Sequence, residues 1–127
     1  MAWVIPSNPK MYDIAGAFSE FDVIEWRQST YVQAGDTVFI YVGGESKAIM
    51  YKCVAEETDL FGQGEIDDSK YFKEMEKKPD RRYMRLRLVE KYASDRYPYA
   101  KLKENGLKSV QGPSKVCAEL EEYLSNN

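Results

Sequence analysis

Histidine is absent from this chain of 127 residues, and cysteine occurs only twice, at Cys53 and Cys117. Without histidine, the chain has neither the Ser-His nor the Cys-His pair that activates a nucleophile, and it lacks the commonest transition-metal ligand. Two cysteines alone cannot form a four-ligand zinc site of the usual kind. One lies in a strand-like run and the other in a helix-like run, so we expect both to be buried as small apolar side chains. Because no paired-carboxylate motif stands out either, binding is favoured over catalysis. We expect a protein that is not an enzyme and that carries no cofactor or metal.

Long apolar runs are missing as well, and none approaches the roughly 20 residues that a membrane helix requires. The first residues show neither the basic segment nor the small-residue cleavage site of a signal peptide, so we expect a cytoplasmic protein without a membrane partner. Apolar residues make up 43% of the chain and charged residues 31%, which is typical of a globular domain. The length predicts a single domain over residues 1–127.

Basic residues are scarce in the first part of the chain. Residues 1–72 carry 5 basic and 12 acidic side chains, whereas residues 73–127 carry 13 basic and 9 acidic ones. Since the net charge is −3, a nucleic acid would have to be held by a local basic patch. Such a patch would contact phosphates without reading sequence, although a solvated loop and strand face explains the same charges. The candidate phosphate contacts are Lys77, Lys78, Arg81, Arg82, Arg85 and Arg87.

The spacing of the apolar residues predicts short strands and helices in alternation. We expect strands at 2–5, 23–26, 37–42, 48–55 and 83–89. We expect helices after Asn8, within 69–78, at 101–105 and from Ser114, and a loop over 56–68. This order predicts an α+β domain, in which a mixed, mostly antiparallel sheet forms a small open or closed barrel with flanking helices.

Two segments combine aromatic with polar side chains, in a chain whose 10 tyrosines help to raise the aromatic content to 13%. In WVIPSNPKMY, a strand ends and Ser7 and Asn8 follow at an expected helix N-terminus, whose free N–H groups could read a ligand edge; a plain helix cap is the alternative. In IEWRQS, Trp26 stands among polar neighbours and could stack a base, which contributes about 1–3 kcal/mol. A core tryptophan at a barrel rim is the alternative. Gln111, in the late loop KSVQGPSK, could also approach a ligand, although a helix cap explains that loop as well.

Taken in order, these segments resemble the EVE domain, a PUA-like fold related to the YTH and ASCH domains. An N-terminal strand is followed by SNP and a tyrosine, then by a tryptophan at the end of a second strand, then by GDTVFIYVGG. The resemblance extends from residue 3 to about residue 123. It is carried by Trp3, Ser7, Asn8, Pro9, Tyr12, Trp26, Gly35, Asp36, Tyr41, Gly43 and Gly44.

The resemblance implies a pseudo-barrel with a pocket for a flipped-out modified base. That base is modified cytosine in DNA for EVE domains and N6-methyladenine in RNA for their YTH relatives. By position, Asn8 would read the base edge with Ser7 beside it, and Trp26 would form one aromatic wall. The second wall could be Tyr12, Tyr31 or Tyr97. The full set of implied base-binding residues is Ser7, Asn8, Tyr12, Trp26, Arg27, Gln28, Tyr41 and Gln111.

The sequence therefore predicts a non-enzymatic module that binds nucleic acid through a modified base, with DNA favoured over RNA. Any effector function would require a partner protein. Two alternatives stay open: a domain that binds a small molecule or nucleotide in the same pocket, and an enzyme of the ASCH kind. A positive track leading from the pocket would favour the nucleic-acid-binding module. A closed acidic rim would favour the small-molecule domain, and a lysine–carboxylate pair that points at Trp26 would favour the enzyme.

Overall fold

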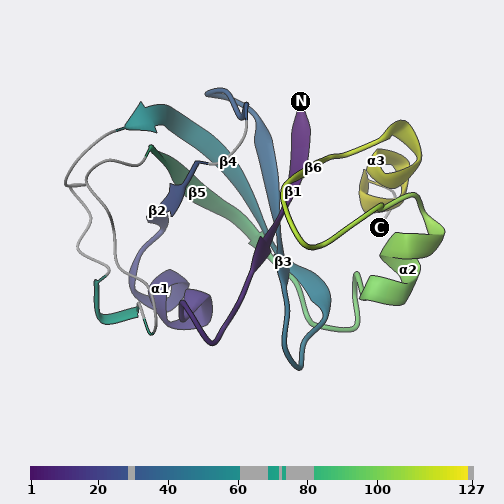
Figure 1. The fold of residues 1–127 in the computed structure, drawn as a ribbon, viewed down its shortest axis with the longest axis horizontal. Helices are drawn as coiled ribbons and strands as arrows, with labels where there is room; N and C mark the ends of the chain where they lie inside the picture. Colours follow the sequence, from purple (N-terminus) through teal and green to yellow (C-terminus); the bar gives the residue numbers. More distant parts are fainter. Residues whose placement is uncertain (29–30, 61–68, 72, 74–81, 126–127) are drawn as a thin grey trace.

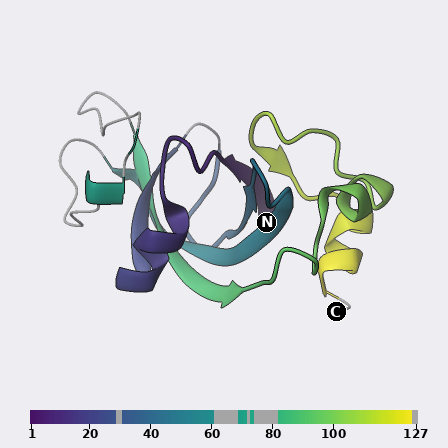
Figure 2. The same cartoon turned by 90° about the horizontal axis from the view of Figure 1, so that it is seen from below.

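The computed structural model describes residues 1–28, 31–60, 69–71, 73 and 82–125. These residues form one curved sheet with helices on either side of it (Figures 1 and 2). The strands are β1 (Ala2–Ser7), β2 (Val23–Arg27), β3 (Thr37–Val42), β4 (Ala48–Leu60), β5 (Tyr83–Lys91) and β6 (Ser114–Lys115). The helices are α1 (Ile14–Glu20), α2 (Tyr99–Glu104) and α3 (Ala118–Ser125), with a 3-10 turn η1 (Ser69–Tyr71).

The sheet is mixed, mostly antiparallel and open. Its strand order is β2-β5-β4-β3-β1-β6, and β1 with β3 is the parallel pair in that order. The neighbours β2–β5, β5–β4, β4–β3 and β1–β6 are antiparallel. The predicted α+β class and sheet type are confirmed. The barrel does not close, because the two edge strands β2 and β6 have no pairing with each other among the described residues.

Both faces of the sheet are covered, which gives the domain two apolar cores. In β1, Trp3 and Ile5 join the core that contains α1, whereas Val4 joins the core that contains α2 and α3. In β3, Val38 and Phe39 are divided between the two cores in the same way. Successive side chains of a strand point to opposite faces, so continuous apolar runs are expected in strands that are buried on both sides. The prediction that 37–42 is buried on both faces is confirmed.

The helix predicted to follow Asn8 begins later. The Asn8 side chain accepts a hydrogen bond from the Lys10 backbone N–H at 3.0 Å, so it closes a local turn. Helix α1 begins at Ile14, and Asp13 caps it by accepting from the Gly16 N–H at 3.1 Å. Asparagine is common in such turns as well as at helix caps, so Asn8 forms the turn and Asp13 serves as the helix cap. The predicted helix N-terminus at Asn8 is therefore wrong.

Three further boundaries differ from the prediction. Strand β4 continues to Leu60 instead of ending before a loop at residue 56, because its polar end pairs with β5. Residues 114–115 form β6 against β1, and the last helix starts only at Ala118. Of the helix predicted within 69–78, the described part is η1, and the remainder lies outside the described residues.

The two cysteines have different environments. Cys53 is fully buried in β4, as predicted, and its burial raises the pKa of the thiol to about 12. Cys117 is exposed, so the prediction that it is buried is wrong. It precedes α3 instead of lying within the apolar face of that helix.

The Gly-Asp pair before β3 has a structural role. Asp36 is buried, and its carboxylate accepts hydrogen bonds from the Trp3 indole N–H at 3.1 Å and from the Gln33 N–H at 2.9 Å. Gly35 supplies the positive φ of 95° that this turn requires. Trp3, Gly35 and Asp36 therefore hold the start of β3 beside β1.

We expect Asp36→Asn to lower the free energy of unfolding by about 1–3 kcal/mol at pH 7, because a carboxylate accepts these bonds more strongly than an amide does. Burial acts to raise the pKa of Asp36, but the hydrogen bonds from Gln33, Trp3 and the N-terminal amino group outweigh it and leave the pKa lowered. A carboxyl with a lowered folded pKa stabilises the protein above its unfolded pKa of about 3.9, and the gain is lost as the pH falls through the folded pKa.

Urea unfolding of the wild type and the Asp36→Asn variant at pH 7 and at about pH 3 checks this prediction. The stability difference should shrink at the lower pH. Asp95→Asn, at an exposed position, is the matched control and should change stability little at either pH. A difference that is the same at both pH values would show that the Asp36 charge is not responsible.

Candidate functional site

A cleft of about 950 Å³ is lined by the C-terminal ends of β1, β2 and β3. It lies within the usual size range of small-molecule pockets, about 300–1,000 Å³. Its lining comes from parts of segments 5–12, 25–27, 41–47 and 110–113, together with Tyr83 and Tyr99. The fold thus brings four segments that are far apart in the sequence to one place.

Seven of the eight predicted base-binding residues line this cleft. They are Ser7, Asn8, Tyr12, Trp26, Arg27, Tyr41 and Gln111. Gln28 is the exception: it is buried, its side-chain oxygen accepts from the Asp59 N–H at 2.7 Å, and its amide donates to the Val32 carbonyl at 3.4 Å. Gln28 therefore has a structural role, while the binding roles of the other seven remain predictions.

Trp26 belongs both to the cleft and to the edge of a core. It is half-buried, packs against the core that contains α1, and lines the cleft. Its ring meets the Tyr12 ring edge to face, with centroids 5.2 Å apart and an interplanar angle of 87°. Two perpendicular rings cannot form the parallel walls of a slot, so Tyr12 supports Trp26 by an edge-to-face contact.

The other candidates for a second wall lie elsewhere. Tyr31 is 86% exposed and lines no part of the cleft, and Tyr97 is buried in the core beside α2 and α3. Two tyrosines that the sequence did not single out, Tyr83 and Tyr99, line the cleft instead. Tyr99 contacts Tyr41 with ring centroids 6.1 Å apart. Apart from alternation within a strand, the sequence contains no signal that would have selected them.

Ser7 lines the cleft and carries a buried, unsatisfied hydroxyl. Only 4% of the residue is exposed, and its Oγ has no hydrogen-bond partner among the described residues. The Ser7 carbonyl, by contrast, accepts from the Gly43 N–H at 2.9 Å, so the backbone at this point is fixed. Buried polar side-chain atoms are nearly always hydrogen-bonded, and an exception calls for an explanation.

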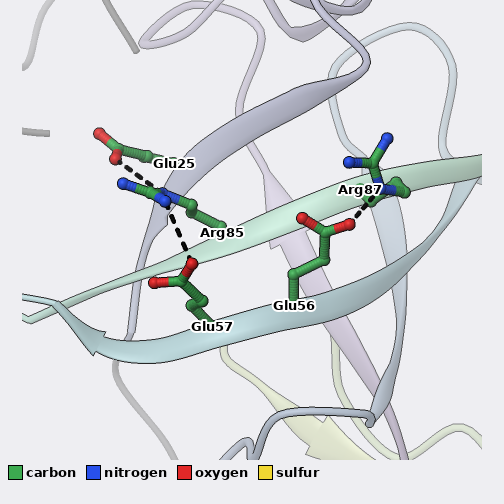
Figure 3. Close-up of polar contacts among 5 residues, drawn as sticks. All are labelled: Glu25, Glu56, Glu57, Arg85 and Arg87. Carbon is green, nitrogen blue, oxygen red and sulfur yellow. Dashed lines mark hydrogen bonds and ion pairs between the residues drawn. The ribbon is translucent and has the colours of Figure 1, made fainter. Parts of the chain in front are cut away.

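Glu25 is a cleft residue that the sequence reasoning missed. It is 3% exposed, and Arg85 Nε donates to its Oε2 at 3.4 Å from the directly opposite position on β5 (Figure 3). Arg85 also pairs with Glu57 of β4 at 3.2 Å. The signal for this pair is the cross-strand register, which a single sequence does not reveal.

The basic outer face that was predicted for 83–89 is neutralised by carboxylates. Figure 3 shows the arginines of β5 pointing toward glutamates of the neighbouring strands. Since these charges are already paired, a phosphate would have to compete with the glutamates. Lys77, Lys78 and Arg81 lie outside the described residues. Among those described, Arg82 pairs with Asp59, Arg85 with Glu25 and Glu57, and Arg87 with Glu56.

Two kinds of feature are missing from the parts of the chain that the structure describes. None of their helices is long and apolar enough to cross a membrane. No group of three or more acidic or cysteine side chains is placed to hold a metal ion.

Comparison with solved structures identifies the fold. No family model matches the sequence, and no curated protein matches it either. The chain is similar to ASCH from Zymomonas mobilis, with a TM-score of 0.65, 14% identity and coverage of 98% of this chain and 94% of that one. ASCH domains belong to the PUA-like superfold. The fold of this chain is PUA-like.

Two further structures agree with this PUA-like fold. A point variant of the Zymomonas mobilis protein gives a TM-score of 0.61 at 14% identity, covering 98% of this chain and 96% of that one. A Rhodopseudomonas palustris protein solved by NMR gives 0.57 at 14% identity, with 98% and 90% covered. Identities this low show the fold alone. The predicted resemblance is therefore confirmed for the PUA-like superfold, while membership of the EVE family stays a prediction.

Proposed function

We propose that this PUA-like domain is a non-enzymatic module that binds nucleic acid by accepting one extruded base in the cleft. The observation that carries the proposal is the buried, unpartnered hydroxyl of Ser7, a residue that lines the cleft together with aromatic rings. Leaving such a group unsatisfied costs about 1–3 kcal/mol. A hydrogen bond from the edge of a bound base would remove that cost.

The size and lining of the cleft suit a base. A planar aromatic ligand can stack on Trp26, and stacking contributes about 1–3 kcal/mol per base. Extruding a base from a duplex costs a few kcal/mol. Stacking together with two or three hydrogen bonds, from groups such as Ser7 and Asn8, offsets a cost of that size. Single-stranded or mispaired substrates would therefore bind more tightly than a fully paired duplex.

Modified cytosine in DNA is the proposed base, and its support is the resemblance of the chain to EVE domains. One buried methyl group adds only about 0.8 kcal/mol, which is roughly a fourfold preference over the unmodified base. Stronger discrimination would have to come from hydrogen bonds within the cleft. Any biological effect beyond binding would then require a partner protein.

The small-molecule domain and the ASCH-like enzyme, the two alternatives, would both use the same cleft. A free nucleoside or nucleotide could occupy it without a polymer, and an ASCH-like enzyme would act on a ligand there. The Glu25 carboxylate forms an ion pair with Arg85, whereas the catalytic alternative called for a lysine–carboxylate pair that points at Trp26. The binding proposal is therefore preferred, and the smaller ligand becomes an outcome of its test.

Tryptophan fluorescence at low salt tests the proposal. The titrants are oligonucleotides, single- and double-stranded, that contain cytosine, 5-methylcytosine, 5-hydroxymethylcytosine, adenine or N6-methyladenine, with the free nucleosides alongside. Trp3 is buried in a core, so the signal is expected from Trp26, and Trp26→Phe assigns it. We expect selective quenching by one modified oligonucleotide. A response to nucleosides alone would favour the small-molecule alternative, and no response to any titrant would refute the proposal.

Ser7→Ala should separate binding from folding in the same titration. We expect the affinity for the selected base to fall about fivefold, the value of one neutral hydrogen bond of about 1 kcal/mol. The free energy of unfolding should stay the same or rise, because the variant removes a buried hydroxyl that has no partner. Ser94→Ala, at an exposed position outside the cleft, is the control. Lower stability with unchanged affinity would assign Ser7 a structural role only.

A further inference from the structure

Three basic side chains surround the same cleft, and two of them were not predicted as site residues. Lys10 comes from the turn after β1, Arg27 from the end of β2, and Lys47 from the hairpin between β3 and β4. All three are exposed, whereas Ser7 and Glu25 of the same cleft are buried. The cations therefore lie at the mouth, whereas Ser7 and the rings of Tyr12, Tyr41 and Tyr83 lie deeper.

Within the described residues, no carboxylate neutralises the charges at the mouth. No ion pair is formed by Lys10, Arg27 or Lys47 within the described part of the chain, in contrast to the arginines of β5. Among the described acidic residues, Glu25 is the one that lines the cleft, and it is paired with Arg85. The cleft therefore has a net positive mouth on a chain whose net charge is −3.

The backbone of Lys47 is held in one conformation. Its φ of 48° is in the left-handed region, which costs a residue with a side chain about 1–2 kcal/mol. The Tyr99 N–H donates to the Lys47 carbonyl at 2.8 Å and holds this conformation, and Tyr99 itself lines the cleft. Strained backbone that the surroundings enforce is often found where a side chain must be presented in one direction.

We infer that Lys10, Arg27 and Lys47 form a phosphate-binding mouth, so that the ligand is a nucleotide unit with its base inside the cleft and its phosphate at the entrance. This inference rests on the proposed function and names the second half of its ligand. Cations beside a cleft with apolar walls concentrate the field there, and unpaired cations bind phosphate without displacing a carboxylate. The phosphate contacts are thereby assigned to the mouth of the cleft instead of to the arginines of β5, which are already paired with carboxylates.

The three cations could bind either the phosphate of a free nucleotide or a phosphodiester group of a nucleic-acid strand. The probes are therefore the nucleosides of the titration above, their 5′-monophosphates, and single-stranded oligonucleotides that carry the same bases. For the wild type at low salt, we expect the monophosphate to bind roughly tenfold more tightly than its nucleoside, the effect of one or two charge-assisted hydrogen bonds. The ratio should fall as salt is added.

The deciding variant is the double change Lys10→Gln and Lys47→Gln. We expect it to reduce the ratio between monophosphate and nucleoside severalfold, with Arg27 as the remaining cation of the mouth, and to change the affinity for the nucleoside much less. The matched control is Lys91→Gln with Lys108→Gln, which changes the net charge equally at two exposed lysines outside the cleft. The control should keep the wild-type ratio.

The outcomes separate this inference from the proposed function. A double variant that keeps the wild-type ratio, or a wild type that binds nucleoside and monophosphate equally, would overturn the phosphate mouth and leave the base cleft standing. Absence of binding by every probe would overturn both. When the ratio falls as expected, a similar loss with the oligonucleotides identifies a strand as the source of the phosphate. A loss confined to the monophosphates identifies a free nucleotide.

Discussion

Replacing Trp26 with alanine should lower the affinity of the cleft for a base by about 5- to 150-fold, the range that corresponds to the loss of 1–3 kcal/mol of stacking. The same change should lower the free energy of unfolding by about 2 kcal/mol, because Trp26 also packs against the core and against Tyr12. The resemblance implied a wall residue for Trp26, and a core tryptophan was the alternative. The structure gives Trp26 both roles, so we expect a folded but less stable variant.

Binding of a fluorescently labelled oligonucleotide, followed by anisotropy, measures the effect of Trp26→Ala without relying on tryptophan emission. Urea unfolding of the same sample shows what fraction is folded during the titration. Trp26→Phe is the control, because it keeps an aromatic face and should retain most of the affinity. A folded Trp26→Ala variant with wild-type affinity would show that no base stacks on this ring.

Much of the candidate site could be predicted because its residues stand at the ends of strands. Ser7, Trp26 and Tyr41 are the last or next-to-last residues of β1, β2 and β3, and those three strand ends line the cleft. The ordered motif linked the strand ends, and the PUA-like fold brings them together in space.

The missed residues depend on information that a single sequence does not contain. Glu25 is defined by the strand opposite it, since Arg85 faces it across β2 and β5. Gln28 has the polar character of a ligand contact, but it is buried, and its side-chain oxygen accepts a hydrogen bond from the Asp59 N–H at the end of β4. Asn8 and Asp13 are both residue types that cap helices, but the chain uses Asp13 as the cap of α1 and Asn8 in a local turn. Register and packing decide each of these cases.

The polar end of β4 explains why the basic face was misjudged. Residues 56–60 are rich in acidic side chains, which are unusual in strands, so they were expected to form a loop. They stay in the sheet because each acid meets a base: Glu56 meets Arg87, and Glu57 meets Arg85. The acidic first part of the chain and the basic second part therefore pair across β4 and β5. These ion pairs between β4 and β5 are one structural reason for the charge asymmetry between the two parts of the chain.

The two arginine pairs of β5 should differ strongly in their effect on stability. We expect Arg85→Ala to lower the free energy of unfolding by about 3 kcal/mol, because it removes a partner from a buried glutamate. The side chains of Arg85 and Glu25 are 18% and 2% exposed. Those of Arg87 and Glu56 are 49% and 35% exposed, so Arg87→Ala should cost no more than about 1 kcal/mol. Urea unfolding of the two variants, which differ from the wild type by the same charge, measures the contrast.

The cause of the Arg85 effect can be tested by a second change on the facing strand. Glu25→Gln introduced into the Arg85→Ala variant should recover a substantial part of the lost stability, because the buried carboxylate that has lost Arg85 is then replaced by a neutral amide. Equal losses for Arg85→Ala and Arg87→Ala would contradict the prediction, and so would the absence of recovery. The result also decides how binding data on β5 are interpreted. If Arg85→Ala destabilises the domain as expected, weaker nucleic-acid binding after a change at Arg85 is explained by a disturbed cleft lining at Glu25. The matched change at Arg87 does not disturb Glu25, so it tests phosphate contact on this face of β5.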